Sequence, residues 1–230
     1  MKVSYLNKIS PLGLNLFTDK YQISEETKTA DLLLVRSASM HETEINENLI
    51  AVARAGAGVN NIPLDKMAEA GVVVFNTPGA NSNGVKELVL AGMLMSARDL
   101  VGGIDWVRNN KADQDILKTI EKAKAAFGGN ELLGKTILLL GLGAIGGKVA
   151  NACVDLGMKV IGYDPYLSDE ARAFLNPNVI INNVLEESYP VADYISLHLP
   201  LLDTTKEMIN EKVFAQMKEG VVILNFSPML

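Results

Sequence analysis

The chain is poor in the residues that build metal sites and disulfide frameworks. Its 230 residues include one cysteine, Cys153, and two histidines. A single cysteine cannot form an internal disulfide, and no cysteine and histidine residues have the spacing of a zinc site. We therefore expect no bound metal, and a reduced, cytoplasmic setting. Cys153 lies on one face of an expected helix with Ile145 and Val149, so we expect it in the core.

Long apolar runs and an excess of positive charge are also missing. No stretch approaches the ~18 consecutive apolar residues of a membrane span. The first seven residues are too short an apolar run for a signal peptide, and Pro11 and Gly13 interrupt the next segment of the chain. Lysine and arginine number 21 against 27 aspartates and glutamates, a net charge of −6. This balance argues against nucleic-acid and anionic-membrane partners, and with the missing membrane span it leads us to expect a soluble protein.

What the sequence does contain is an alternation of β-rich runs and helix-length segments, which predicts a parallel α/β architecture. The expected strands are residues 3–6, 32–35, 50–54, 72–75, 136–140, 158–163, 179–181, 193–198 and 221–226. The expected helices are residues 63–71, a long one over 85–110 that continues over 111–124, and 145–156, 169–175 and 205–218. The long helix is expected to contain a domain boundary, near residue 95.

The strongest motif is a glycine fingerprint, Gly141-x-Gly143-x-x-Gly146, between an expected buried strand and an expected amphipathic helix. In this context the first glycine permits a tight turn, the second lets a pyrophosphate approach the backbone, and the third lets helix and strand pack closely. The free N–H groups of the helix start would hold the phosphate charge. Asp164 ends the next strand, where its carboxylate can accept both ribose hydroxyls of NAD and would repel the 2′-phosphate of NADP. The alternative is a glycine turn in an α/β domain that binds nothing.

Four further stretches resemble a single family. They are residues 54–63, 81–90, 133–136 and 192–201, and with the fingerprint they are spread along the chain from residue 54 to residue 201. The chain is similar to the D-isomer-specific 2-hydroxyacid dehydrogenases, and its Asn60-Asn61-Ile62-Pro63 run resembles the 3-phosphoglycerate dehydrogenase branch. The resemblance implies NAD-dependent hydride transfer to or from a D-2-hydroxy acid, in serine biosynthesis.

The same resemblance implies the architecture. Residues 1–95 would form a flavodoxin-like substrate domain, and residues 96–230 a Rossmann domain with a doubly wound parallel sheet. A homodimer would be built on the long helix and its neighbours when the protein is complete.

Site residues can be assigned from the resemblance position by position. Cofactor contacts are implied for Gly141, Gly143, Ala144, Ile145, Gly146, Asp164, His198, Leu199, Pro200, Phe226 and Ser227. Substrate contacts are implied for Arg36, Ser37, Gly56, Ala57 and Asn81. Arg36 has a plainer alternative, an exposed arginine at the sheet edge, and His198 has one as a structural histidine at the end of a strand. His198 does not match the acid–base histidine of the family.

One departure from the family concerns catalysis. Pro228 stands where the family has a substrate-orienting arginine, and the positions of the family's glutamate and acid–base histidine fall beyond Leu230. A proline supplies neither a charge nor an N–H donor. We therefore expect a C-terminally truncated chain with no catalytic residues, no activity alone and a Rossmann sheet that lacks its last strand. Two alternatives stay open: a catalytically inactive NAD-binding module, and a dehydrogenase for another D-2-hydroxy acid. Arg36 disfavours the second, because an uncharged substituent needs no cation.

Overall fold

The computed structural model describes residues 1–227, so Pro228 lies outside the described residues. The chain forms two compact units, Met1–Asn81 and the part from Ser82 onward. The boundary between the units lies at Asn81–Ser82, before the domain boundary that the sequence predicts near residue 95. The reason is that the long helix joins the second core through Val89, Met93 and Ala97. None of the helices in residues 1–227 is long and apolar enough to cross a membrane.

The first unit is built on a parallel sheet of five strands in the order β2-β1-β3-β4-β5. The strands are β1 (Lys2–Tyr5), β2 (Gln22–Ser24), β3 (Leu32–Val35), β4 (Ala51–Arg54) and β5 (Val73–Phe75). This 2-1-3-4-5 order is that of flavodoxin-like folds, which confirms the predicted class. The strand β2 was not expected from the sequence, because it is short and has no apolar run. Two short helices, α1 (Pro11–Leu14) and α2 (Leu64–Glu69), accompany the sheet.

The second unit has its own parallel sheet, in the order β10-β9-β6-β7-β8. Its strands are β6 (Thr136–Leu140), β7 (Lys159–Tyr163), β8 (Ile180–Ile181), β9 (Tyr194–Leu197) and β10 (Val222–Asn225). In chain order this is 3-2-1-4-5, the Rossmann arrangement with the switch point between β6 and β9. Within the described residues β10 forms the edge of the sheet, as predicted.

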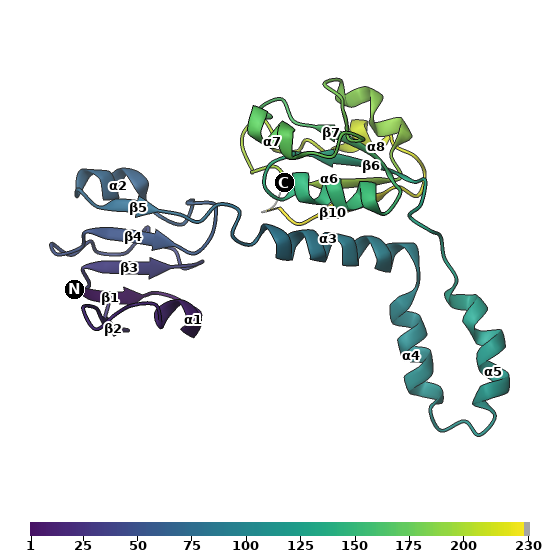
Figure 1. Ribbon diagram of the computed structural model, residues 1–230, viewed down its shortest axis with the longest axis horizontal. Helices are drawn as coiled ribbons and strands as arrows, with labels where there is room; N and C mark the ends of the chain where they lie inside the picture. The colour runs from purple at the N-terminus through teal and green to yellow at the C-terminus, as the bar shows by residue number, and fades with distance from the viewer. Residues whose placement is uncertain (228–230) are drawn as a thin grey trace. The chain divides into compact units, whose positions relative to one another are not determined.

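The central strand β6 is buried on both faces because helices and loops cover both sides of the sheet (Figure 1). Since side chains alternate along a strand, Ile137 and Leu139 enter one apolar cluster while Leu138 and Leu140 enter the other. The first cluster includes Val149 and Cys153 of α6 (Gly146–Asp155) and the buried face of α3 (Ser82–Ala97). Cys153 is therefore a core residue, as predicted.

The predicted helix over residues 85–110 is wrong in its continuity. It divides into α3 and α4 (Leu100–Asn110), because the Asp99 carboxylate accepts a hydrogen bond from the Gly102 N–H at 2.8 Å and starts a new helix. After a turn, α5 (Ile116–Ala123) is the second arm of a hairpin, and η1 (Lys124–Phe127) contacts both arms (Figure 1).

The predicted helix over residues 205–218 is also wrong in extent. Only α8 (Glu211–Phe214) is helical there, because Asn210 caps it by accepting from the Lys212 and Val213 N–H groups. The remaining elements are α7 (Asp169–Phe174) and the short turns η2 (Leu185–Glu187) and η3 (Tyr189–Val191).

Candidate dinucleotide site

The pairing register of the second sheet brings the predicted cofactor residues to one edge. Leu140 pairs with Tyr163 and with Leu197, and Leu197 pairs with Asn225. The residues directly after these strand ends therefore meet at the carboxyl edge of the sheet: Gly141, Asp164, His198 and Phe226. This edge, at the switch point, is where open α/β sheets bind ligands.

Two fingerprint glycines have structural reasons to be glycine. Gly141 has φ = +93°, and a Cβ there would lie 2.8 Å from the His198 carbonyl oxygen. At Gly146 a Cβ would lie 1.9 Å from the Gly141 carbonyl oxygen, so a side chain would push α6 off β6. Gly143 differs, because no atom of the part of the chain that the structure describes lies within 4 Å of the position of its Cβ. No protein packing explains a glycine there, and the open space lies on the solvent side of the turn.

The start of α6 carries hydrogen-bond donors that no group within residues 1–227 uses. Ile145 is the N-cap and provides no side-chain cap. The N–H groups of Gly143, Ala144 and Ile145 donate to no acceptor among the described residues, and the first bond of the helix is Gly147 N–H to the Gly143 carbonyl at 2.9 Å. Unpaired N–H groups at the positive end of a helix form an anion site. The residues of the fingerprint thus fit the pyrophosphate of a dinucleotide.

Asp164 is fixed beside this turn by two backbone groups. Its Oδ2 accepts from the Leu142 N–H at 2.9 Å, and its Oδ1 accepts from the Tyr166 N–H at 3.0 Å. Each carboxylate oxygen has a second lone pair, so both can still accept a hydroxyl. Tyr166 beside it is 87% exposed, an aromatic surface that the sequence analysis did not select. The Asp164-Pro165-Tyr166 run after a strand was the signal that could have found it.

His198 is held in its neutral form by its surroundings. Burial lowers its pKa from 6.5 to about 4, and its Nε2 lies 3.0 Å from the Oγ of the buried Ser196. Its backbone lies against Gly141, while its Cβ is 3.5 Å from the Cβ position of Gly146. His198 therefore packs against the glycine turn, as a structural histidine at the end of a strand would do.

The loop after His198 is fastened by a threonine that the sequence analysis did not select. The Thr205 hydroxyl donates to the Pro200 carbonyl at 2.6 Å and accepts from the Leu202 N–H at 2.8 Å. Leu199 reaches back to the turn, with its Cδ2 3.0 Å from the Gly141 Cβ position. These bonds hold Leu199 and Pro200 at the carboxyl edge.

Phe226 and Ser227 come directly after the edge strand β10. The Ser227 hydroxyl donates to the Leu197 carbonyl at 3.0 Å, which fastens the chain to β9. The Phe226 ring packs against α3, 3.5 Å from the Cβ position of Gly92. Its backbone lies at the carboxyl edge while its ring joins the core.

The first unit also gathers its predicted residues at the carboxyl edge of its sheet, and there Asn7 organises the loop after β3. Its Oδ1 accepts from three consecutive N–H groups, those of Arg36, Ser37 and Ala38, at 3.2, 3.0 and 2.8 Å. A side-chain oxygen thus occupies the backbone donors of this loop. The Arg36 and Ser37 side chains, which are exposed, are what remains for a ligand.

The loop after β4 offers fewer donors than the sequence suggests. The Gly56 N–H donates to the Thr77 hydroxyl at 2.8 Å, whereas the Ala57 N–H has no acceptor among the described residues. Arg54 lies under this loop, with its Nη1 3.3 Å from the Cβ position of Gly56, and its Nε donates to the Arg36 carbonyl at 3.1 Å. Arg54 is a second cation at this edge. It was not assigned to the site from the sequence, although it begins the stretch 54–63 that resembles the family. Asn81 is exposed at the end of the unit.

The fold and the fingerprint define a Rossmann dinucleotide-binding protein, and the comparisons give the family. Residues 90–228 match the family model described as D-isomer specific 2-hydroxyacid dehydrogenase, NAD binding domain. The chain belongs to the D-isomer-specific 2-hydroxyacid dehydrogenase family, and its second unit is the NAD-binding domain.

Two curated relatives illustrate the range of the family. The chain is 37% identical over 210 residues to the hydroxypyruvate reductase of Thermotoga maritima, which covers 90% of this chain and 63% of that protein. It is 36% identical over 215 residues to the D-3-phosphoglycerate dehydrogenase of Homo sapiens, with 90% and 38% covered. The chain thus spans less than two thirds of the length of these relatives.

Solved structures agree in fold. A 3-phosphoglycerate dehydrogenase from Entamoeba histolytica, bound to NAD+, superposes with a TM-score of 0.73 at 25% identity, over 99% of this chain and 72% of that one. The pyruvate reductase of Chlamydomonas reinhardtii gives 0.77 at 23% identity, over 98% and 68%.

Proposed function

We propose that the second unit binds NAD at the carboxyl edge of its sheet. The N–H groups of Gly143, Ala144 and Ile145 hold the pyrophosphate, and the open space at Gly143 lets it approach the backbone. The unpaired donors at the start of α6 are the observation that carries this proposal. When bound, the nicotinamide supplies the centre that accepts or donates a hydride.

We assign the ribose hydroxyls to Asp164, whose carboxylate is already aligned by two backbone N–H groups. A carboxylate accepts from both hydroxyls of NAD and repels the 2′-phosphate of NADP, so the unit prefers NAD. Around the rest of the cofactor, the backbone of His198, Leu199, Pro200, Phe226 and Ser227 forms the border, on top of a turn shaped by Gly141 and Gly146.

The substrate that we propose is a D-2-hydroxy acid with a phosphate at its far end, as in 3-phosphoglycerate, and the activity is that of serine biosynthesis. Two guanidinium groups at the edge of the first unit, those of Arg36 and Arg54, support a phosphorylated ligand. The free Ala57 N–H is a donor for the carboxylate.

This specificity can be tested by equilibrium binding of 3-phosphoglycerate and of glycerate, which lacks the phosphate. The unmodified chain should prefer 3-phosphoglycerate, and Arg36→Met should remove at least about tenfold of that preference. Lys28→Met, which removes an exposed charge elsewhere in the unit, should leave it unchanged. Equal binding of the two acids by the unmodified chain would favour a 2-hydroxy acid without a phosphate group, such as glycerate.

A second candidate is an NAD-binding module without turnover, and the histidines favour it. Hydride transfer to a keto acid needs a proton donor near the carbonyl. His198 is neutral and turned toward Ser196, and the His41 Nε2 lies 2.9 Å from the Asn60 carbonyl oxygen. The 230-residue chain should therefore bind NADH and yet show no oxidation of 3-phosphoglycerate. Turnover at an ordinary rate, about 1–10³ s⁻¹, would show that another group accepts the proton of the substrate hydroxyl.

We also propose a homodimer through the helical hairpin. The α4 helix exposes a row of large apolar side chains, Leu100, Val101, Ile104 and Val107, each 46–53% exposed. Rows of this size on a helix mark an interface, and the family resemblance points to a second copy. Ile104→Glu should convert a dimer to a monomer in light scattering, whereas Asp105→Lys on the same helix should not. A monomeric unmodified chain would contradict the proposal.

A further inference from the structure

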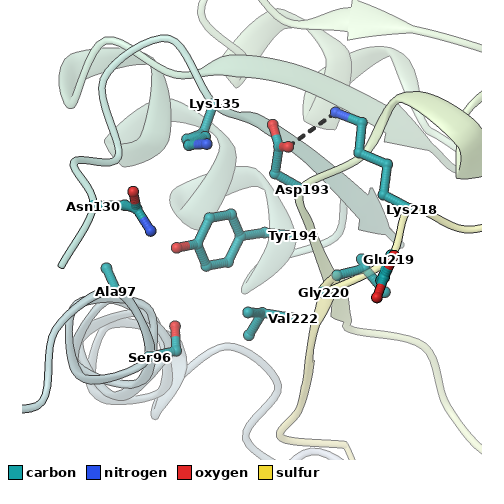
Figure 2. Close-up of a pocket in the computed structure, with 11 residues that line it drawn as sticks. Ser96, Ala97, Asn130, Lys135, Asp193, Tyr194, Lys218, Glu219, Gly220 and Val222 are labelled. Carbon is teal, nitrogen blue, oxygen red and sulfur yellow. Dashed lines mark hydrogen bonds and ion pairs between the residues drawn. The ribbon is translucent and has the colours of Figure 1, made fainter.

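A cavity lies in the NAD-binding unit, at the opposite end of its sheet from the fingerprint. It has a volume of about 210 Å³, several times the ~30 Å³ share of a water in the liquid. The end of α3 and the residues that lead into β6, β9 and β10 line it, as Figure 2 shows. Lys135 precedes β6 and Asp193 precedes β9, so the cavity opens at the amino edge of the sheet. We call it the amino-edge pocket.

The single aspartate among the residues that line the pocket already forms an ion pair with a lysine. Asp193 Oδ1 accepts from the Lys218 ammonium at 2.9 Å, and its Oδ2 accepts from the Thr136 N–H at 2.8 Å. Burial alone would raise the pKa of Asp193, but the Thr136 N–H, Lys218 and the nearby Lys135 together hold it below its ordinary value. Asp193 is thus ionised and directly paired with Lys218, whereas Lys135 interacts with it only at longer range and has no direct partner among the described residues.

Lys135 is half-buried, and its ammonium has no ion-pair or hydrogen-bond partner among the described residues. Glu219 belongs to the lining but is exposed, where solvent screens its charge. A cation without a partner in a partly enclosed cavity attracts an anion more strongly than a surface lysine does, because less water competes for it.

Neutral donors accompany this charge. In Figure 2 the hydroxyl of the buried Tyr194 and the side chain of the exposed Asn130 point into the space between α3 and Lys135, and no protein group among the described residues accepts from either. The nearby end of α3 does not compete for them. Its Ala97 carbonyl already accepts from the Asn130 N–H at 2.9 Å, and the Ser96 hydroxyl donates to the Met93 carbonyl at 2.8 Å.

We propose that the amino-edge pocket binds a small oxyanion, either a phosphate or a carboxylate group. The Lys135 ammonium, the Tyr194 hydroxyl and the Asn130 amide donate to its oxygens. The pocket is separated from the fingerprint by the length of the strands, four or five residues at about 3.3 Å each. A ligand there does not compete with NAD, so the pocket is a site for an effector and not part of the cofactor site.

The test is calorimetric titration with inorganic phosphate at constant ionic strength, in the presence of NADH so that the fingerprint donors are occupied. The unmodified chain should show saturable binding at one site, and Lys135→Met should weaken it at least about tenfold. Tyr194→Phe should weaken it by a smaller factor. Lys159→Met is the matched control, because Lys159 is an exposed lysine at the same edge that does not line the pocket.

A parallel titration with malonate identifies the source of the oxyanion: tighter phosphate binding indicates a phosphorylated effector, and tighter malonate binding a carboxylic acid. Equal weakening by Lys135→Met and Lys159→Met would overturn the proposal, as would the absence of saturable binding of both probes. Retained NADH binding by Lys135→Met shows that the variant is folded. If the unmodified chain does not bind NADH, the titration is run without it. Phosphate binding that Gly143→Ala abolishes while Lys135→Met spares would then assign the anion to the fingerprint and overturn the proposal.

Discussion

Replacement by alanine should have different effects on stability at Gly146 and at Gly143. The added Cβ clashes with the protein backbone at Gly146 and enters open space at Gly143. A Cβ at position 146 would lie 1.9 Å from the carbonyl oxygen of Gly141 and 2.9 Å from its carbonyl carbon, and these two atoms belong to the backbone. Relief requires α6 to move away from β6, and overpacking of this kind costs about 1–3 kcal/mol. For a unit of this size each kcal/mol lowers the unfolding midpoint by about 2–4 °C. Gly146→Ala should thus be less stable and also bind NADH more than about tenfold more weakly.

Gly143→Ala is the matched control. No atom of the described residues lies within 4 Å of the added Cβ, so the methyl group meets no clash among them. Its stability should be unchanged or raised by about 0.4–1 kcal/mol, because alanine restricts the unfolded chain. Its NADH affinity should nevertheless fall at least about tenfold, because the methyl group occupies the space where the pyrophosphate approaches. Thermal unfolding followed by circular dichroism, with NADH calorimetry on the same samples, measures both quantities. Unchanged stability of Gly146→Ala, or unchanged NADH affinity of Gly143→Ala, would refute this reasoning.

Three further predictions concern single side chains. The pKa of His198 is about 4 in the folded chain and 6.5 ordinarily, so the unfolded chain binds the proton at a higher pH than the folded chain does. The stability that this group contributes is therefore present above pH 6.5 and is lost as the pH falls toward 4. The loss amounts to about 3 kcal/mol. In denaturation curves measured between pH 6.5 and pH 4, His198→Asn should lack this loss of stability. The same pH dependence in the variant and in the unmodified chain would contradict the prediction. Burial raises the pKa of Cys153 to about 12, so iodoacetamide at pH 8 should modify it only through unfolding, and NADH should slow the reaction; rapid labelling of the folded chain would show an open core. Asp99→Ala should lower stability by about 0.5–2 kcal/mol through loss of the α4 cap, whereas the exposed Asp105→Ala should have little effect; equal effects would argue against the cap.

Much of the fold could be predicted from the sequence because its central strands are apolar on both faces. The run from Thr136 to Leu140 has the composition of a buried parallel strand, and the structure gives β6 these bounds. The long helix could not be divided, since its composition stays favourable through Arg98. Only the capping bond of Asp99, which depends on the local backbone, ends one helix and starts the next.

The candidate site divides in the same way. The positions of Gly141, Gly146 and Asp164 follow from local rules of turn and strand, and the structure supplies a packing or hydrogen-bonding reason for each. The roles of Asn7 and Thr77 could not be predicted, because they depend on which strand ends are neighbours in the sheet. These two residues accept from the N–H groups of Arg36, Ser37 and Gly56, so these groups are not free for a substrate. The position of Arg54 at this edge was likewise not expected from the sequence.

The central claim, an NAD site that combines the fingerprint with the carboxylate of Asp164, is tested most directly by calorimetry with both cofactors. The unmodified chain should bind NADH at one site per chain and NADPH at least about tenfold more weakly, because the 2′-phosphate meets the carboxylate. Asp164→Asn keeps an oxygen for the Leu142 N–H but removes the charge, so it should weaken NADH binding and narrow the difference between the cofactors. Equal affinity of the unmodified chain for NADH and NADPH, or no binding of either, would contradict the account.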